Sequence, residues 1–311
     1  MMTTAITAQV ADYLVSRRAM GFDLRGEGYQ LHAFARFAGE QDAETLTLEL
    51  LLRWVQGSVA PGPVTAARRV EVLRPFLKYC RQFDPCCPVL PLGLCGPGHR
   101  RLSPHIYTEA EVTDLLAASD DLKPRGLRPL TYVTLFGLLA ATGMRLSEAL
   151  HLERKDLNPD QPSLTVRETK FKKSRLVPIH ATTAAALAEY EKATLATPRR
   201  SGVETLFLTS TGLPIPKRTI HSTFNDLRRR LRWIARGGHA YPRIHDLRHT
   251  FICQALLRGQ QDNQIDHVAD AISTYVGHAK VSDTYWYISA TPELMSSASE
   301  RFSHFSSEVR R

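Results

Sequence analysis

Long apolar runs are missing from this sequence. The most apolar stretch, Tyr132 to Ala141, is far shorter than the roughly 18 to 20 residues that a membrane-spanning helix needs. The first residues, MMTTAITAQVADYL, lack a basic segment followed by an apolar run, so we expect no secretory signal. The sequence therefore predicts a protein without a membrane partner.

Cysteine is scarce and unevenly distributed. The five cysteines form an odd number in a chain of 311 residues, which favours reduced thiols in a bacterial cytoplasm over a disulfide framework. Four of them lie between Cys80 and Cys95, so a zinc site is one possible interpretation. Their spacing lacks the paired C-x2-C knuckles of structural zinc sites, and Pro85 and Pro88 interrupt it. A proline-stiffened linker is the preferred interpretation, and no metal is predicted.

Three common catalytic signatures are also absent. The chain has no G-x-x-x-x-G-K-[ST], no H-E-x-x-H and no G-x-S-x-G, which counts against P-loop enzymes, zinc metalloproteases and α/β-hydrolases. Positive charge is in excess: 40 Lys and Arg against 31 Asp and Glu give a net charge of +9. This surplus is consistent with a polyanionic partner, although composition does not distinguish DNA from RNA or an anionic membrane.

A segment rich in proline and glycine divides the chain. Residues 85–104 lack helical or alternating periodicity and are predicted to be a linker. Residues 1–84 before it are predicted to form a small four-helix domain. Its amphipathic stretches are Ile6 to Met20, Tyr29 to Ala38, Leu46 to Val55 and Val64 to Phe83.

Residues 105–311 show a mixed pattern. Two short β-prone runs, Ser163 to Arg167 and Arg175 to Ile179, flank a basic turn and predict a hairpin. The remaining periodic stretches predict helices, so the fold class is mainly α with a small β component. The predicted helices are Glu109 to Ala118, Leu130 to Ala141, Ala181 to Thr194, Thr219 to Ala235, Asp246 to Leu257, Asp266 to Tyr275 and Glu293 to Phe302.

Cationic, imidazole and phenol side chains gather at helix starts and turns of this second domain. Taken singly, each has an ordinary structural explanation, such as an ion pair, a solvated turn, a helix cap or a core aromatic. Taken together, they could neutralise a phosphodiester in its transition state and supply a nucleophile. The candidates are Arg145, Lys170, His245, Arg248, His278 and Tyr287.

Four motifs that carry these residues resemble the tyrosine recombinases of the phage integrase family. The similarity extends over nearly the whole chain, and the motifs occur in the family's order. They are ATGMRLSEAL for the first arginine box, TKFKKSRLVPIH for the β-hairpin lysine, HDLRHTF for the H-x-x-R box and VGHAKVSDTYWY for the final histidine–tyrosine box. Within the second motif, the spacing to Val-Pro selects Lys170 rather than Lys172 or Lys173. The YWYISATPEL stretch weakly favours transposon-borne members.

The resemblance implies a helical, SAM-like core-binding domain followed by an α+β catalytic domain, and it implies the chemistry. Tyr287 would attack the scissile phosphate and form a 3′-phosphotyrosine. Arg145 and Arg248 would bind the nonbridging oxygens. The product would be rejoined DNA, so the expected activity is site-specific integration, transposition or resolution of a mobile genetic element.

The other residues have implied roles as well. Lys170 would protonate the leaving 5′-oxygen, His245 would assist proton transfer from the tyrosine, and His278 would hydrogen-bond the phosphate. Glu148 would orient a neighbouring histidine or arginine. No metal, nucleotide or other cofactor is expected, since the covalent ester conserves the bond energy.

The partner implied is double-stranded DNA with specific recombination sites. Arg68 and Arg69 in the last helix of the first domain, and Lys172 and Lys173 in the basic turn, are predicted to bind it. A homo-tetramer on DNA is expected, or a hetero-assembly with sister recombinases, in which residues beyond Tyr287 pass to a neighbouring protomer.

Two departures and two alternatives accompany the resemblance. Tyr275-Val276 replaces a commoner apolar pair, and Phe171 stands where the lysine turn usually has glycine. A type IB topoisomerase would use the same chemistry but carries no similar compact core-binding domain. A DNA-binding accessory protein without catalysis is the alternative from another functional class.

Overall fold

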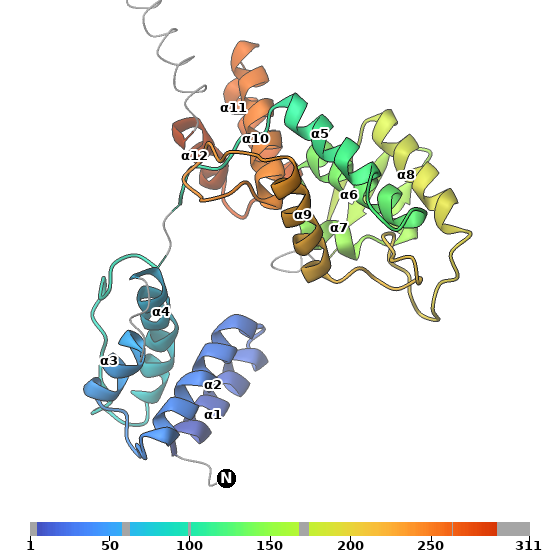
Figure 1. Cartoon of the computed structure of the whole chain (residues 1–311). Coiled ribbons are helices and arrows are strands. Elements are labelled where there is room, and N and C mark those ends of the chain that lie inside the picture. Colours follow the sequence, from blue (N-terminus) through green and yellow to red (C-terminus); the bar gives the residue numbers. More distant parts are fainter. Residues whose placement is uncertain (1–4, 58–62, 99–100, 168–173, 263, 291–311) are drawn as a thin grey trace, which may run out of the picture. The chain divides into compact units, whose positions relative to one another are not determined.

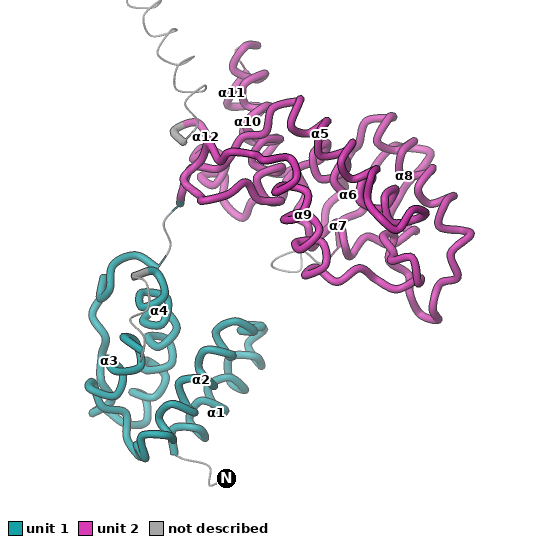
Figure 2. Tube along the Cα trace, viewed as in Figure 1, with its two compact units in different colours: residues 1–101 teal, residues 102–311 magenta. Residues whose placement is uncertain are grey.

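The computed structural model describes residues 5–57, 63–98, 101–167, 174–262 and 264–290, which form two compact units. Residues 1–101 make up the first unit and residues 102–311 the second (Figure 2). Among the described residues, no helix is both long and apolar enough to cross a membrane.

In the described part of the first unit, four helices pack together (Figure 1). Their inward faces form one apolar core that includes Phe34, Leu51 and Phe76. The boundaries follow local signals: Thr47 caps α3 by accepting a hydrogen bond from the Leu50 amide. The helices are α1 (Ala5–Ala19), α2 (Arg25–Glu40), α3 (Leu48–Gln56) and α4 (Pro63–Cys80).

The predicted linker, residues 85–104, is divided between the two units. Cys87 and Leu90 are buried against the helical core of the first unit. Near the other end, the Ser103 carbonyl accepts a hydrogen bond from the Gly238 amide in the second unit. Much of this segment is therefore packed structure, because its apolar side chains complete a core that the four helices leave open.

The second unit is helical with one small sheet. Its first helices are α5 (Glu109–Asp120), α6 (Leu127–Thr142), α7 (Leu146–His151) and the 3-10 turn η1 (Arg154–Asp156). The strands β1 (Leu157–Asn158), β2 (Ser163–Val166) and β3 (Arg175–Pro178) pair antiparallel in that order. Leu164 pairs with Val177, and both side chains are buried in the core under α6. This confirms the mainly α fold class with a small β component.

The remaining helices of this unit are α8 (Ala181–Thr194), α9 (Lys217–Arg230), α10 (Ile244–Gln261), α11 (Ile265–Val276) and α12 (Ser282–Ala290). Helix α9 ends five residues before the predicted boundary at Ala235, because the chain enters a left-handed conformation at Arg232 (φ 53°). Helix α12 was not predicted. The expected helix from Glu293 to Phe302 lies outside the described residues.

Candidate active site

Two arginines from different helices converge where α6 ends. Gly143 closes α6 in a left-handed conformation (φ 60°), and Arg145 follows at the start of α7. Arg248 on α10 is only 3% exposed, and its guanidinium donates to the carbonyl oxygens of Gly143 (2.9 Å) and Val276 (2.8 Å). Burial, followed by the nearby Arg145, lowers the pKa of Arg248 to about 10, so it remains a cation at neutral pH.

Glu148 links Arg145 to Arg175 on the strand β3. One carboxylate oxygen accepts from the Arg145 guanidinium at 2.7 Å, and the other accepts from Arg175 on β3 at 2.9 Å. Burial alone would raise the pKa of Glu148, but the hydrogen bonds from Arg175 and from the Arg145 amide outweigh it and hold the pKa below its usual range. Glu148 therefore holds the Arg145 guanidinium in place. It also binds Arg175, which the sequence analysis did not identify as a site residue.

The end of α11 positions a histidine. Gly277 closes this helix with φ 71°, and the following amide, from His278, donates to the Ser273 carbonyl at 2.9 Å. The Gly277 carbonyl accepts from Arg145 at 3.0 Å, which connects this turn to the arginine pair. The His278 imidazole lies 2.7 Å from the Thr284 hydroxyl. A glycine is favoured here because φ lies in the left-handed region, and an added Cβ would also lie 2.9 Å from the Arg175 guanidinium.

Tyr287 lies on α12 and is 4% exposed. The rings of Tyr287 and His278 are nearly parallel, with centroids 6.3 Å apart. The phenol oxygen is 2.6 Å from Nδ1 of His249 on α10. His249 was not among the predicted site residues, although the second histidine of HDLRHTF follows Arg248 directly and could have been noticed.

His245 lies one helical turn before His249, at the edge of a cavity of about 270 Å³. The same cavity is lined by Arg145 and by Lys217 and His221 from α9. His245 is exposed to this cavity, but protein atoms on its other sides remove part of its hydration. This desolvation, followed by the nearby cations Arg248 and Arg243, lowers the pKa of His245 to about 4. Its imidazole is therefore neutral at neutral pH.

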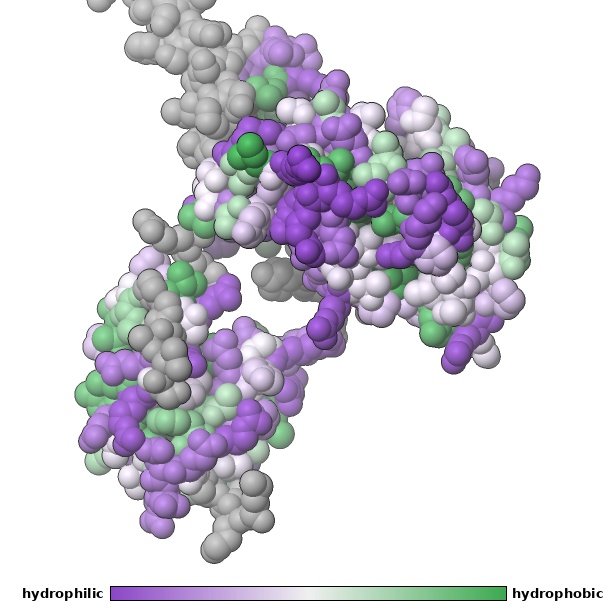
Figure 3. Space-filling model, viewed as in Figure 1, coloured by the Kyte–Doolittle hydropathy of each residue, from purple (hydrophilic) through white to green (hydrophobic). Residues whose placement is uncertain are grey.

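The sequence analysis did not identify Lys217 and His221 as site residues. The many basic residues of α9 could have pointed to this helix. Hydrophilic side chains gather over α9 on the face shown in Figure 3. Spaced four residues apart, Lys217 and His221 lie on one side of the helix and add positive charge beside Arg145.

The structure thus brings together five of the six predicted catalytic residues. They are Arg145, His245, Arg248, His278 and Tyr287, with Glu148 beside them. Lys170, Lys172 and Lys173 lie outside the described residues. The strand β3, which follows them in the chain, begins at Arg175, and the Arg175 side chain contacts Glu148 in the site. No group of three or more His, Cys, Asp or Glu that could hold a metal occurs in the described part of the chain.

The predicted DNA-binding arginines of α4 differ from one another. Arg69 donates to the Trp54 carbonyl at 2.7 Å, and its guanidinium lies over the Trp54 ring, 5.1 Å from the centroid. It therefore satisfies a free carbonyl at the end of α3 rather than extending from the surface. Arg68, at the preceding position, is exposed.

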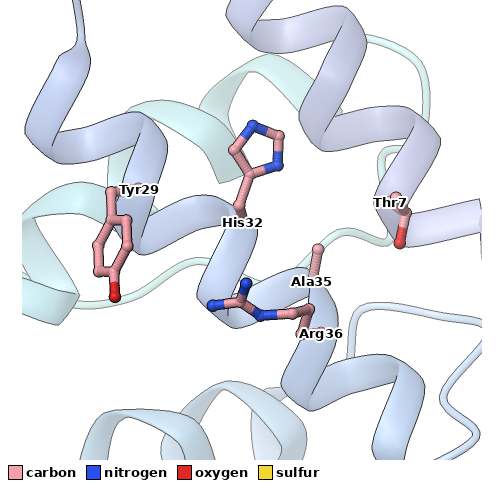
Figure 4. A pocket seen from close by; sticks show the side chains of 5 residues that line it. All are labelled: Thr7, Tyr29, His32, Ala35 and Arg36. Atoms are coloured by element: carbon pink, nitrogen blue, oxygen red, sulfur yellow. The ribbon is translucent and has the colours of Figure 1, made fainter.

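A second hollow lies on the first unit, between α1 and α2 (Figure 4). Its volume is about 460 Å³, and its lining includes Tyr29, His32 and Arg36. These three exposed side chains occupy successive turns of α2. An aromatic ring, an imidazole and a guanidinium in one hollow are groups that suit a nucleic-acid surface.

This chain is similar to known proteins of one family. Residues 106–293 match the model of the phage integrase family. A putative integrase/recombinase of Sinorhizobium fredii, y4rB, is 37% identical over 94% of this chain and 95% of its own length. A tyrosine recombinase XerC of Staphylococcus saprophyticus is 25% identical over 74% and 72% of the two chains.

Two solved structures have a similar fold at low identity. The Tn1549 transposon integrase in complex with transposon right end DNA has a TM-score of 0.66 at 17% identity, covering 95% of this chain and 99% of its own. The XerH site-specific recombinase bound to its difH substrate has a TM-score of 0.64 at 18% identity, covering 88% and 78%.

Proposed function

The chain belongs to the phage integrase family of tyrosine recombinases, enzymes that cut and rejoin DNA at specific sites, and from this premise we propose how its residues divide the reaction. The Tyr287 oxygen attacks the scissile phosphorus, and the bond from phosphorus to the 5′-oxygen breaks. This leaves a 3′-phosphotyrosine and a free 5′-hydroxyl, and attack by a 5′-hydroxyl of the partner duplex reverses the step. The observation that carries this proposal is the position of the Tyr287 phenol: its ring lies parallel to that of His278, and its oxygen is 2.6 Å from His249, which lies one helical turn after His245 on α10.

The cations of the site stabilise charge on the phosphate. Arg145 and Arg248 bind the nonbridging oxygens, where preformed guanidinium groups stabilise the transition state most effectively. Glu148 and the carbonyls of Gly143 and Gly277 hold both guanidinium groups in place beforehand. His278 donates a hydrogen bond to the phosphate.

Proton transfer needs a base for the phenol and an acid for the leaving oxygen. His245 is neutral at neutral pH and faces the cavity, so it assists removal of the Tyr287 proton. Lys170 protonates the leaving 5′-oxygen. No metal or nucleotide takes part, because the phosphotyrosine ester retains the energy of the broken bond.

The DNA contacts extend over both units. Lys217 and His221 add contacts beside the scissile phosphate, together with Lys172 and Lys173 of the basic turn. In the first unit, Arg68 binds the backbone, and the hollow lined by His32 and Arg36 faces DNA. Lysine and arginine contacts to phosphate make the affinity strongly dependent on salt.

We also propose how the protomers assemble and where the enzyme acts. Four protomers act on two recombination sites, as a homo-tetramer or with sister recombinases. Residues 291–311 of each protomer bind its neighbour. The element mobilised lies in bacterial DNA, so the enzyme works in the cytoplasm.

A nicked suicide substrate tests the nucleophile, since the intermediate accumulates on it as a covalent protein–DNA adduct. We expect adduct from the wild type and from Tyr285→Phe, whose phenol donates to Asp266 at 3.0 Å outside the site. Tyr287→Phe should form none, and excess chelator should leave the wild-type yield unchanged. An adduct with Tyr287→Phe would disprove the assignment, and site binding without any adduct would favour the accessory-protein alternative.

Truncation tests the assembly. Protein ending at Ala290 should bind a single site but cleave it far more slowly than the full chain, and it should not pair two sites in a gel-shift experiment. Recombination at the full-length rate would refute the exchange of residues 291–311 between protomers.

A further inference from the structure

His249 contacts the nucleophile but has no part in the mechanism above. It occupies the α10 position after Arg248, with its side chain 15% exposed, and its Nδ1 lies 2.6 Å from the Tyr287 phenol oxygen. The ring of His245 also contacts it, with centroids 4.7 Å apart and the planes nearly perpendicular. His249 therefore contacts both the proposed base and the proposed nucleophile.

We propose that His249 is a positioning residue: its hydrogen bond keeps the Tyr287 phenol protonated and in a stored position inside its own protomer until DNA binding releases it. This inference rests on Tyr287 being the nucleophile. Burial supports the stored position, because Tyr287 is only 4% exposed and little of the residue is accessible to a DNA phosphate from outside.

The geometry indicates the direction of the hydrogen bond. Nε2 of His249 faces Oδ1 of Asp246 at 4.0 Å, and Asp246 is fully buried and bound to the Arg243 guanidinium at 2.7 Å. A proton on Nε2 points toward that carboxylate, which leaves the Nδ1 lone pair to accept the phenol proton. Tyr287 is then the donor, and its proton remains on oxygen.

The same surroundings make His249 a poor base. Desolvation, followed by His245 and Arg243, lowers the pKa of His249 to about 2. Full transfer of the phenol proton to this ring is therefore unfavourable at neutral pH. His245 faces the cavity instead, so holding and deprotonating the phenol fall to two different histidines of α10.

Acetylation of tyrosine by N-acetylimidazole, followed by peptide mass spectrometry, measures how firmly the phenol is held. In the wild type we expect Tyr285, which is 39% exposed, to react and Tyr287 to be protected. His249→Leu removes the acceptor at similar volume, and loss of one neutral hydrogen bond should raise Tyr287 acetylation about 2- to 10-fold. His249→Asn keeps a polar atom close to the Nδ1 position and should stay within about twofold of the wild type. Unchanged acetylation in folded His249→Leu would overturn the proposal.

Cleavage of a single nicked site separates holding from catalysis. If the bond must break before attack, His249→Leu should form adduct about 2- to 10-fold faster than the wild type, and His249→Asn should match the wild type. Losses above about tenfold in both variants would instead identify His249 as the base and refute a positioning role. Acetylation needs no cleavage, so a protein that forms no adduct would refute the proposed function without affecting the first measurement.

Discussion

Replacing Glu148 with Gln is the sharpest test of how the arginine pair is held. Glu148 is 9% exposed and accepts from the Arg145 guanidinium (2.7 Å), the Arg145 amide (2.9 Å) and the Arg175 guanidinium (2.9 Å). Glutamine keeps the shape and one acceptor oxygen but removes the negative charge. Arg145, Arg175 and Arg248 would then lie close together without the carboxylate that neutralises them.

The expected magnitude follows from the burial of the pair. Breaking a buried ion pair by removing one partner costs about 3 to 5 kcal/mol. The Arg145 side chain is 29% exposed, and the retained amide oxygen keeps part of the network, so we expect about 2 to 4 kcal/mol for Glu148→Gln. Misplacement of Arg145 should also slow adduct formation about 10- to 100-fold.

The pH dependence has a definite sign. The pKa of Glu148 in the folded state lies below its ordinary value of 4.5, so its contribution is fully present above pH 4.5 and is lost as the pH falls through the folded-state pKa. The stability difference between wild type and Glu148→Gln should therefore be constant at neutral pH and shrink below pH 4.5. Urea titration read by hydrogen-exchange mass spectrometry reports the second unit separately from the first.

Glu191→Gln is the matched control. Glu191 pairs with Arg154 at 2.6 Å, but the two side chains are 25% and 38% exposed, so this substitution should cost only about 0 to 1 kcal/mol. Equal losses for both substitutions would refute the reasoning. So would a Glu148→Gln difference that persists unchanged well below pH 4.5.

Three further predictions concern stability and reactivity. Arg69→Ala should destabilise the first unit by about 1 to 2 kcal/mol in urea, since the Trp54 carbonyl loses its donor, whereas exposed Arg68→Ala should change it by less than about 0.5 kcal/mol. Gly143→Ala should cost more than Gly202→Ala in thermal unfolding: their φ values are similar (60° and 78°), but only at Gly143 of the two does a new Cβ meet a ring, that of Phe251, at 2.5 Å. N-ethylmaleimide labelling followed by mass spectrometry should find fast reaction at the exposed Cys86 and Cys95 and slow reaction at the buried Cys80, Cys87 and Cys253. Burial also raises the pKa of Cys80 to about 12, which keeps this thiol protonated and unreactive at neutral pH.

Much of the fold could be predicted from local sequence patterns. The apolar periodicity of each segment determines a helix face, and glycine after Val276 or Thr142 ends its helix with a left-handed residue. The hairpin of β2 and β3 followed from two β-prone runs around a basic turn. These signals are short-range, so they survive in a single sequence without any knowledge of neighbours.

The sequence did not predict helix α12, and it predicted that α9 extends beyond its actual end at Arg230. The α12 segment, SDTYWYISA, is rich in β-branched and aromatic residues that favour strands, and it becomes helical against the core formed with Ile252 and Leu256. Helix α9 has no proline or glycine at its end, so nothing in the sequence announced the turn at Arg232.

The sequence by itself predicted that Arg145, His245, Arg248, His278 and Tyr287 belong to one site, because the spacing within each motif relates residues of one local segment. Only the tertiary structure decided which of them touch. Arg175 reaches Glu148 from a strand, and His249 reaches Tyr287 across 38 residues. Arg69, a predicted DNA contact, donates to the Trp54 carbonyl at the end of another helix. Such contacts join segments far apart in the chain, and their partners are set by how helices pack, which no local spacing encodes.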